Sequence, residues 1–293
     1  MKIPRLTPPV LAAKHEAFQQ QCGCTGDELG LDTNLMMAWE PVFRFFYEGY
    51  FDVKVVGWEN IPQDGPVILI GNHSGGLPVD AFMLANGFIN HHSSPRPARA
   101  LAHAWLRRTG FLNRLIAGLG AVPATLDVAV NLLNHNRVVV FYPEGVKGTG
   151  KPYALRYRLE DFDPGFVKAA ILTGAPIVPV TTVGGDDIYP ILYDVRSLAR
   201  LLKMPYFPIT PTFPWLPIFS SCIPLPAKML IKIGKPITLP YPPQEANNRK
   251  LRLHIAREFQ YQIQRDINMI LSKRKSVFGG WEESFIEELS KSA

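Results

Sequence analysis

Short apolar runs, each bounded by glycine or proline, alternate along the chain with stretches that have helical periodicity. The apolar runs lie at residues 53–56, 67–71, 98–102, 137–142, 177–183 and 229–233. The helical stretches between them lie at residues 81–88, 105–118, 128–135 and 165–173. Strands without polar positions, separated by helices, are typical of a sheet that helices cover on both faces. The pattern therefore predicts one α/β domain with a mostly parallel or mixed sheet.

Residues 245–271 carry apolar side chains at steps of four on an otherwise charged segment. This narrow stripe predicts a long helix that packs on the sheet. With it we divide the chain into a helical and aromatic lead-in at 1–52, the α/β domain at 53–240 and C-terminal helices at 241–293. The stripe consists of Leu251, Ile255, Phe259, Ile263, Ile267 and Leu271.

The segment 35–51 holds too many large aromatic side chains for one face of a solvated helix. Such a segment must be buried in the core or seated at a bilayer interface, and the pattern leaves both open. The aromatic residues are Trp39, Phe43, Phe45, Phe46, Tyr47, Tyr50 and Phe51.

The segment 204–227 has no charged residue, and from 205 to 217 it contains a proline at every third position, which is the period of a polyproline II helix. Such a helix would align an apolar ridge along one edge. The ridge could drape over the domain, cover an acyl-chain groove, press into a membrane surface or bind a partner domain. The prolines are Pro205, Pro208, Pro211, Pro214 and Pro217, and the ridge is Phe207, Thr210, Phe213, Leu216 and Phe219.

Composition restricts the classes of partner. A chain of 293 residues that is 47% apolar can bury a sizeable core. The net charge of +6 favours an anionic partner, either a membrane surface or a phosphorylated substrate. No nucleic-acid-binding motif is present. Since no unbroken apolar run reaches the ~18 residues of a spanning helix, we expect a peripheral position on the cytoplasmic face of a membrane.

The three cysteines, Cys22, Cys24 and Cys222, are an odd number in a chain without a secretory signal. They indicate a reducing compartment. The Cys-Gly-Cys pair lacks the second pair that a zinc site requires, so we expect no metal.

The decapeptide GNHSGGLPVD follows the apolar run at 67–71 and contains a histidine and an acid seven positions apart. On one regular helix His73 and Asp80 would be ~10 Å apart. Gly75 and Gly76 permit a tight turn instead, and a proline then suits the first position of a helix that carries Asp80 in its first turn. There Asp80 could orient His73 as a general base. Alternatively, both residues have only structural roles at a strand-to-helix turn.

A second polar segment ends the apolar run at 137–142. Glu144 and Gly145 follow this run and precede a glycine-rich loop with Lys147 and Lys151. An acid at the end of a strand, followed by a glycine-rich loop with lysines, is a plausible binding site for an anion and a hydroxyl. Since the chain has no Gly-x-Ser-x-Gly nucleophile elbow, a hydroxyl that His73 activates would belong to the substrate.

In this order, the two segments resemble the glycerophospholipid acyltransferase superfamily. The first block of that family, Asn-His followed by Asp, resembles Asn72, His73 and Asp80. Its Phe-Pro-Glu-Gly block resembles residues 141–145 with one residue inserted, and its Val-Pro-Val block resembles residues 177–180. The resemblance covers about residues 66–183. It implies the glycerol-3-phosphate acyltransferase-like fold.

The resemblance also implies roles for individual residues. His73 would activate an acceptor hydroxyl for attack on an acyl thioester, and Asp80 would orient His73. The donor would be acyl-CoA or acyl-acyl-carrier protein as a co-substrate, with no other cofactor. A backbone N–H near the two glycines of the decapeptide would bind the oxyanion. The candidate substrate-binding residues are Asn72, Ser74, Gly75, Gly76, Glu144, Gly145, Lys147, Lys151, Arg156 and Arg158.

The chain departs from the family pattern in two ways. Six residues separate His73 from Asp80, where the family usually has four. The second block, at residues 118–125, has no arginine, and Val146 and Lys147 stand where the family has Thr-Arg. Other cations would then have to bind a phosphate, or the acceptor has none, such as a neutral alcohol or diacylglycerol. The candidate cations are Lys147, Lys151, Arg156 and Arg158.

We therefore expect an acyltransferase that acts on a lysophospholipid, another glycerolipid or a lipid alcohol at a membrane. A lipid-binding protein of the same fold without turnover is one alternative. Another is a metallophosphoesterase, because Gly-Asn-His after a strand occurs there too, but the remaining histidines supply no obvious ligand set. These are His15, His91, His92, His103, His135 and His254.

Overall fold

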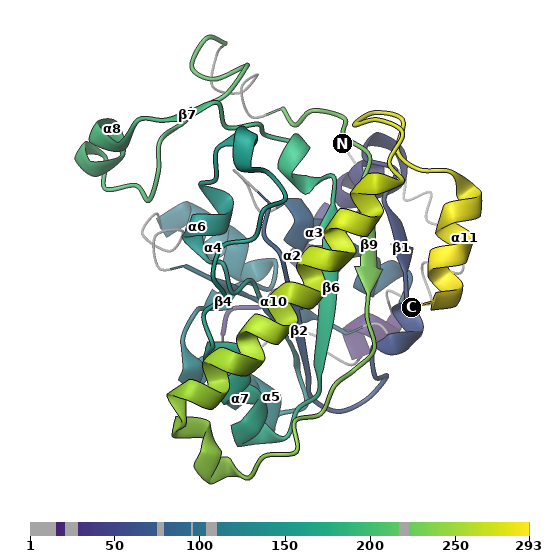
Figure 1. Ribbon diagram of the computed structural model, residues 1–293, viewed down its shortest axis with the longest axis vertical. Coiled ribbons are helices and arrows are strands. Elements are labelled where there is room, and N and C mark those ends of the chain that lie inside the picture. The colour runs from purple at the N-terminus through teal and green to yellow at the C-terminus, as the bar shows by residue number, and fades with distance from the viewer. Residues whose placement is uncertain are drawn as a thin grey trace.

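The computed structural model describes residues 16–20, 29–74, 79–94, 96–103, 110–216 and 223–292 (Figure 1). Within these ranges a seven-stranded sheet has the order β1-β9-β6-β2-β5-β3-β4. Only the pairing of β6 with β9 is antiparallel. The predicted mixed α/β sheet is thus confirmed. Its strands are β1 (Lys54–Val56), β2 (Val67–Gly71), β3 (Ala98–Ala102), β4 (Val122–Pro123), β5 (Val138–Phe141), β6 (Ile177–Val183) and β9 (Leu230–Ile233).

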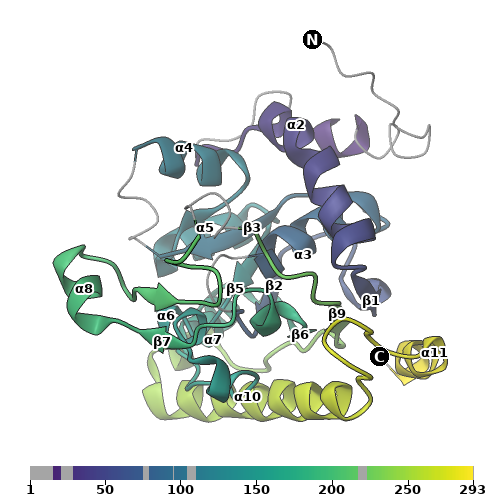
Figure 2. The ribbon, with the colours of Figure 1, turned by 90° about the horizontal axis from the view of Figure 1, so that it is seen from above.

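Helices cover both faces of this sheet (Figure 2). One layer contains α2 (Thr33–Arg44), which continues as the π-helical turn η1 (Phe45–Tyr50), and α3 (Val79–Asn90). The opposite layer contains α5 (Leu126–Asn134), α7 (Gly165–Thr173) and α10 (Arg249–Ser272). Shorter or peripheral helices are η2 (Trp58–Asn60), α4 (Gly110–Gly118), α6 (Val146–Thr149), η4 (Tyr153–Leu155), η5 (Gly185–Asp187), α8 (Arg196–Leu201), η6 (Pro243–Asn247) and α11 (Glu283–Ser292).

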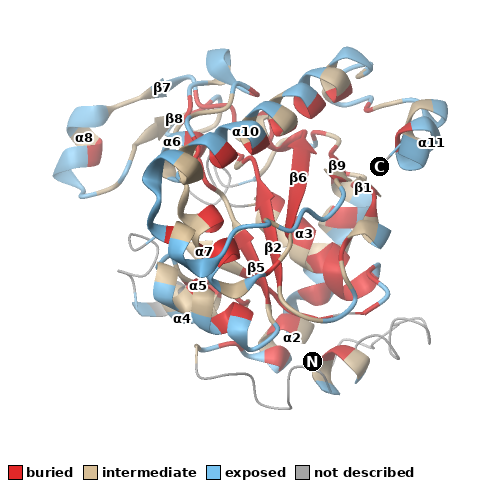
Figure 3. Ribbon diagram, turned by 60° about the horizontal axis from the view of Figure 1, so that its bottom comes forward, coloured by how far each residue is buried: buried red, intermediate tan, exposed pale blue. Residues whose placement is uncertain are grey.

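The residues of the central strands are buried (Figure 3). Their side chains alternate between the two layers. In β2, Ile68 and Ile70 pack with α7 and α10, whereas Val67 and Leu69 pack with α3 and the aromatic segment. This alternation is the period of two that an extended strand imposes. Continuous apolar runs such as 67–71 are therefore required by burial on both faces.

The long helix α10 follows the predicted stripe but drifts off it at the end. Ile255, Phe259, Ile263 and Ile267 are buried, and then Ile270 is fully buried while the predicted Leu271 is partly exposed. A spacing of four exceeds the 3.6 residues of a helical turn, so the buried face shifts back by one residue. None of the helices in the described ranges is long and apolar enough to cross a membrane.

The aromatic segment 35–51 divides its side chains between core and solvent. Tyr47 and Phe51 are buried in the cluster under β2 and β9. Trp39, Val42 and Phe45 are exposed along α2 and the start of η1. The segment thus contributes to the core and also leaves one apolar stripe uncovered.

The prediction of a continuous polyproline II helix after residue 204 is wrong. In the described part of this segment, β8 (Pro208–Ile209) pairs antiparallel with β7 (Tyr193–Asp194), and a turn follows. The Thr210 N–H donates to the Phe213 carbonyl at 3.0 Å, and the Phe213 N–H donates to the Thr210 hydroxyl at 2.9 Å. Strand pairing and a hydroxyl that closes the turn supply hydrogen bonds that a polyproline II helix lacks.

Several predicted features of the chain lie outside the described residues. They include the end of the proline ridge at Pro217 and Phe219, the cysteines Cys22, Cys24 and Cys222, and the start of the predicted helix 105–118.

Gly184 follows β6 at a point where the chain approaches the segment before β9. Its φ is +112°, and a Cβ there would collide with the Lys228 carbonyl oxygen and lie 2.9 Å from Met229 Cα. We expect Gly184→Ala to lower the free energy of unfolding by about 2–4 kcal/mol, because it adds backbone strain and overpacking. Urea denaturation measures the change. Gly49→Ala, which meets nothing within 4 Å, is the control, and equal losses in both variants would contradict the assignment.

Candidate active site

The site begins where β2 stops at the carboxyl edge of the sheet. The Asn72 amide donates to the Thr182 carbonyl at 2.8 Å, and its oxygen accepts the Thr182 N–H at 2.8 Å. The Asn72 side chain thus makes the hydrogen bonds to β6 that the backbone of β2 would make if the strand continued. Both polar groups of Asn72 are engaged in this way, which sets the exit direction of the next residue.

His73 and Asp80 meet across the loop despite the six residues between them. The His73 Nδ1 and Asp80 Oδ2 atoms are 2.9 Å apart. The same Oδ2 accepts the Ser74 N–H at 3.0 Å, and Oδ1 accepts the Ala81 N–H at 2.9 Å. Asp80 is 1% exposed. Gly75, Gly76 and the proline that follows lie outside the described residues, but both ends of the loop are positioned by this carboxylate.

The contact with Asp80 decides which nitrogen of His73 is available for chemistry. An ionised carboxylate only accepts hydrogen bonds, so Nδ1 carries the proton and Nε2 keeps its lone pair. The imidazole ring stacks on Tyr142, with centroids 4.1 Å apart and planes 18° apart. His73 is therefore held on two sides, and it can accept a proton at Nε2 from a hydroxyl placed there.

Glu144, at the end of β5, ties the second segment to the first. Its Oε1 accepts the His73 N–H at 3.2 Å, and its Oε2 accepts the Glu160 N–H at 2.8 Å. The following Gly145 has φ +57° and ψ −143°, a region that only glycine adopts without strain. This backbone conformation allows the chain to turn away while the Glu144 side chain stays buried under His73.

Lys151 neutralises Glu144. Its Nζ lies 2.8 Å from Glu144 Oε2 and donates to the Arg158 carbonyl at 2.7 Å. The side chains of Lys151 and Glu144 are 5% and 0% exposed, so this pair is buried. Breaking such a pair leaves an uncompensated charge, which makes the two residues mutually dependent. Lys151 is thus engaged with the protein at the position where we predicted a cation for phosphate.

The other predicted cations are all exposed residues. Arg156 lies over the Tyr153 ring at 4.3 Å from its centroid. Among the predicted site residues, the structure brings together Asn72, His73, Ser74, Asp80, Glu144, Gly145 and Lys151. Arg156 Nε lies 3.6 Å from Asp187 Oδ1, whereas the side chains of Lys147 and Arg158 are exposed.

A third strand end, which the sequence analysis missed, completes the site. After β6, η5 packs so closely that a Cβ on Gly185 would lie 2.6 Å from Ser74 Cβ. The adjacent Asp187 accepts hydrogen bonds from the Tyr153 and Tyr157 hydroxyls at 2.8 and 2.6 Å. It also pairs with Arg274 at 2.5 Å. Two acids directly after a buried strand were the available signal, the same one that marked Glu144.

The charges around the imidazole determine its protonation. Burial lowers the pKa of His73, but the charge and hydrogen bond of Asp80 and the charges of Glu144 and Asp186 outweigh it. The pKa of His73 therefore lies above its ordinary value. Burial also raises the pKa of Asp186 to about 6, against the opposing effects of the Tyr157 N–H and Lys151. The site thus makes the histidine a stronger base than a free imidazole.

Among the described residues, no three His, Cys, Asp or Glu side chains gather in a group that could hold a metal ion. The arrangement instead offers an oriented imidazole next to two buried carboxylates. It can remove a proton from a substrate hydroxyl and stabilise the imidazolium that results.

The chain is similar in sequence to known acyltransferases and to a mycobacterial protein. A family model named Acyltransferase matches residues 52–183. A protein of Mycobacterium tuberculosis without an assigned function is 38% identical over 258 residues, which cover 87% of this chain and 72% of that protein. A 1-acyl-sn-glycerol-3-phosphate acyltransferase of Borreliella burgdorferi is 26% identical over 147 residues, covering 47% of this chain and 53% of that protein.

A solved structure has a similar fold. It is the 1-acyl-sn-glycerophosphate acyltransferase PlsC from Thermotoga maritima, with a TM-score of 0.50 and 21% sequence identity. The match covers 80% of this chain and 79% of that one.

The raised pKa of His73 can be tested without any substrate. We expect its ring resonances to titrate above the ordinary range for histidine in the wild-type protein. In Asp80→Asn the midpoint should fall, because burial then acts against the imidazolium without the largest compensating charge. Histidine NMR measures both midpoints. Glu288→Gln, an exposed change on α11, is the control for lost charge. An unchanged midpoint in Asp80→Asn would refute the pairing in solution.

Proposed function

The chain belongs to the glycerophospholipid acyltransferase superfamily, and on that premise we propose how this O-acyltransferase works and on what. It transfers a fatty acyl group from a CoA or acyl-carrier-protein thioester to a hydroxyl of a glycerolipid or another lipid alcohol. The observation that carries the proposal is the 2.9 Å contact between His73 Nδ1 and Asp80 Oδ2, which leaves Nε2 available as a base.

In the proposed mechanism His73 moves one proton. Nε2 takes the proton of the acceptor hydroxyl as its oxygen attacks the thioester carbonyl carbon. The tetrahedral intermediate then expels the sulfur, and the imidazolium returns the proton to it. The products are an ester and a free thiol, so atoms and charges balance. General base catalysis of this kind contributes about 10²- to 10⁴-fold to a rate.

Asp80 and Glu144 act as positioning residues in this scheme. Asp80 holds the imidazole in the productive tautomer and stabilises its charged form. Glu144 holds the backbone of His73, because its Oε1 accepts that N–H at 3.2 Å. Neither carboxylate has to change its protonation during the reaction. Both are buried with hydrogen-bonding partners, so they supply fixed negative charge near the imidazolium.

The arrangement of cations favours an acceptor that needs no phosphate. Lys151 is buried and paired with Glu144, and the second block has no arginine. The side chains of Lys147 and Arg158 are exposed, and Arg156 lies 3.6 Å from the carboxylate of Asp187. An acceptor recognised mainly through its hydroxyl and apolar tail fits this arrangement, and such an acceptor resides at a membrane surface. We therefore include a peripheral position on a membrane in the proposal.

A matched pair of histidine variants tests the mechanism. Purified protein with acyl-CoA or acyl-acyl-carrier protein and a set of lipid acceptors should release thiol and form ester, detected by mass spectrometry. We expect His73→Ala to lose about 10²- to 10⁴-fold in rate. His254→Ala, an exposed change on α10, should keep the wild-type rate.

Two results would count against this mechanism. Equal rates for His73→Ala and wild type with every acceptor would show that His73 is not the base. Tight binding of lipid without any cleavage of thioester would favour a lipid-binding protein of the same fold.

The same acceptor set tests the recognition of the headgroup. We expect monoacylglycerol or another neutral lipid alcohol to react within about tenfold of lysophosphatidic acid, which corresponds to ~1.4 kcal/mol. A phosphate held by a buried cation would produce a larger difference, since charge-assisted contacts are the stronger ones. Turnover restricted to the phosphorylated acceptor would show that cations other than Lys151 form a phosphate site.

A further inference from the structure

A folded arm projects from the body beside the candidate active site. It consists of residues 189–216 and includes β7, α8 and β8, with α8 at the far left of Figure 1. The same projection is visible in Figure 2. The Leu192 N–H donates to the Ile209 carbonyl at 2.8 Å, and the Val195 N–H donates to the Phe207 carbonyl at 2.9 Å. These bonds give the arm a defined shape.

Several large apolar side chains are exposed along this arm. Leu201 is 76% exposed and Trp215 is 72% exposed. Soluble proteins tolerate single exposed apolar residues, but a cluster of them marks a surface that meets something apolar. Among the described residues the arm contributes six of the sixteen exposed large apolar side chains, although it is only 28 residues long. They are Leu192, Tyr193, Leu201, Leu202, Trp215 and Leu216.

The charges of the arm are mostly positive. Arg196, Arg200 and Lys203 lie on α8 or directly after it, and the Arg196 side chain is 88% exposed. Asp194 is the arm's acid; it accepts the Phe207 N–H at 2.9 Å and lies 3.9 Å from Arg196. Apolar and aromatic side chains beside such cations are typical of elements that lie in the interface of an anionic bilayer.

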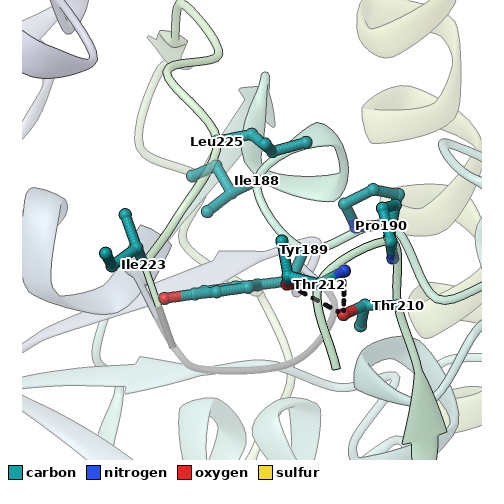
Figure 4. Close-up of a pocket in the computed structure, with 8 residues that line it drawn as sticks. Ile188, Tyr189, Pro190, Thr210, Thr212, Ile223 and Leu225 are labelled. Atoms are coloured by element: carbon teal, nitrogen blue, oxygen red, sulfur yellow. Dashed lines mark hydrogen bonds between the residues drawn. The ribbon is translucent and has the colours of Figure 1, made fainter. Parts of the chain in front are cut away.

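The base of the arm is joined to the active site. The Tyr153 N–H donates to the Ile191 carbonyl at 2.7 Å, and the Tyr206 ring lies where a Cβ on Gly150 would be 2.9 Å away. Both contacts fall on the loop that follows Glu144. Apolar side chains also line a small hollow between the arm and its return segment (Figure 4). These include Ile188, Tyr189, Ile223 and Leu225.

A second apolar stripe lacks the cations of the arm. Trp39, Val42 and Phe45 are exposed on α2 and η1, but the neighbouring Arg44 pairs with the buried Glu40 at 3.2 Å. The Arg44 side chain is 20% exposed. This stripe therefore offers apolar area with little positive charge, and attraction to anionic lipids favours the arm.

We propose that the arm is the element that docks this protein on an anionic phospholipid bilayer. It inserts its apolar side chains at the interface, while its cations contact the headgroups. Because its base contacts the loop after Glu144, docking also turns the carboxyl edge of the sheet toward the membrane. The docking itself does not depend on the proposed function. Only its role, which is to give the site access to a lipid acceptor, rests on the proposed function.

Vesicle flotation with full-length protein tests the docking. The probes are vesicles of phosphatidylcholine with phosphatidylglycerol, and vesicles of phosphatidylcholine alone. We expect wild type to float with the anionic vesicles and to detach at high salt. Leu201→Glu combined with Trp215→Glu should abolish flotation. Arg196→Gln, Arg200→Gln and Lys203→Gln together should weaken partitioning on the order of 100-fold, at about 1 kcal/mol per cation.

Two control variants make the test specific to the arm. Tyr261→Glu on α10, at a position 73% exposed, should float like wild type. Phe45→Glu probes the competing stripe. Circular dichroism with thermal unfolding confirms that each variant is folded. The proposal is overturned when wild type stays unbound, when the arm variants float like wild type, or when only Phe45→Glu detaches the protein.

Activity measurements separate docking from the proposed function. With a short-chain acceptor dissolved in buffer, the arm variants should keep the wild-type rate, and with vesicle-borne acceptor they should lose it. Wild type that docks through the arm but forms no ester would refute the proposed function while docking stands. Ester formation on vesicles that is equal in wild type and arm variants would refute the docking role alone.

Discussion

The buried carboxylate of Asp80 is the interaction on which the arrangement of the site depends. An unpaired charge taken out of water costs several kcal/mol, so such a group must find donors in the folded state. Asp80 finds three, from the His73 ring and from the backbone of Ser74 and Ala81. These donors converge only when β2 stops at Gly71 and α3 begins beside it. Catalytic geometry and the satisfaction of a buried charge are thus one requirement.

The same principle recurs at each strand end around the site. Glu144 after β5 is paired with Lys151, and Asp187 after β6 is paired with Arg274. Every one of these charges is balanced by a protein group from another segment, so the site is organised before any substrate arrives. This balance also engages Lys151, which is bound to Glu144 and to the Arg158 carbonyl.

Much of this arrangement could be predicted from local sequence. Runs such as 67–71 and 177–183 match the strands residue for residue, because strands buried on both faces consist almost entirely of apolar and β-branched residues. The glycines and the proline between His73 and Asp80 indicated that a loop longer than usual could still bring these two side chains together. These features depend on residues close together in the chain, where backbone preferences act directly.

Other features depend on partners far apart in the sequence. The pairing of Asp187 with Arg274 joins segments 87 residues apart, which no periodicity reveals. The ion pair between Lys151 and Glu144 could not be predicted, because a lysine in a glycine-rich loop is equally typical of an anion-binding site. The prediction for the proline-rich segment was wrong for a related reason. A period of three predicts a polyproline II helix only when no strand competes, and the β7 strand supplied hydrogen bonds that this helix cannot make.

The topology of the sheet explains why the arm lies beside the site. β6 runs toward the carboxyl edge, and β9 returns antiparallel from that same edge. A connection between antiparallel neighbours starts and ends at one edge of the sheet, whereas a parallel connection must cross to the other. Any long insertion between β6 and β9 therefore emerges next to His73 and Glu144. The single antiparallel pair in an otherwise parallel sheet thus places an apolar, cationic element at the mouth of the site.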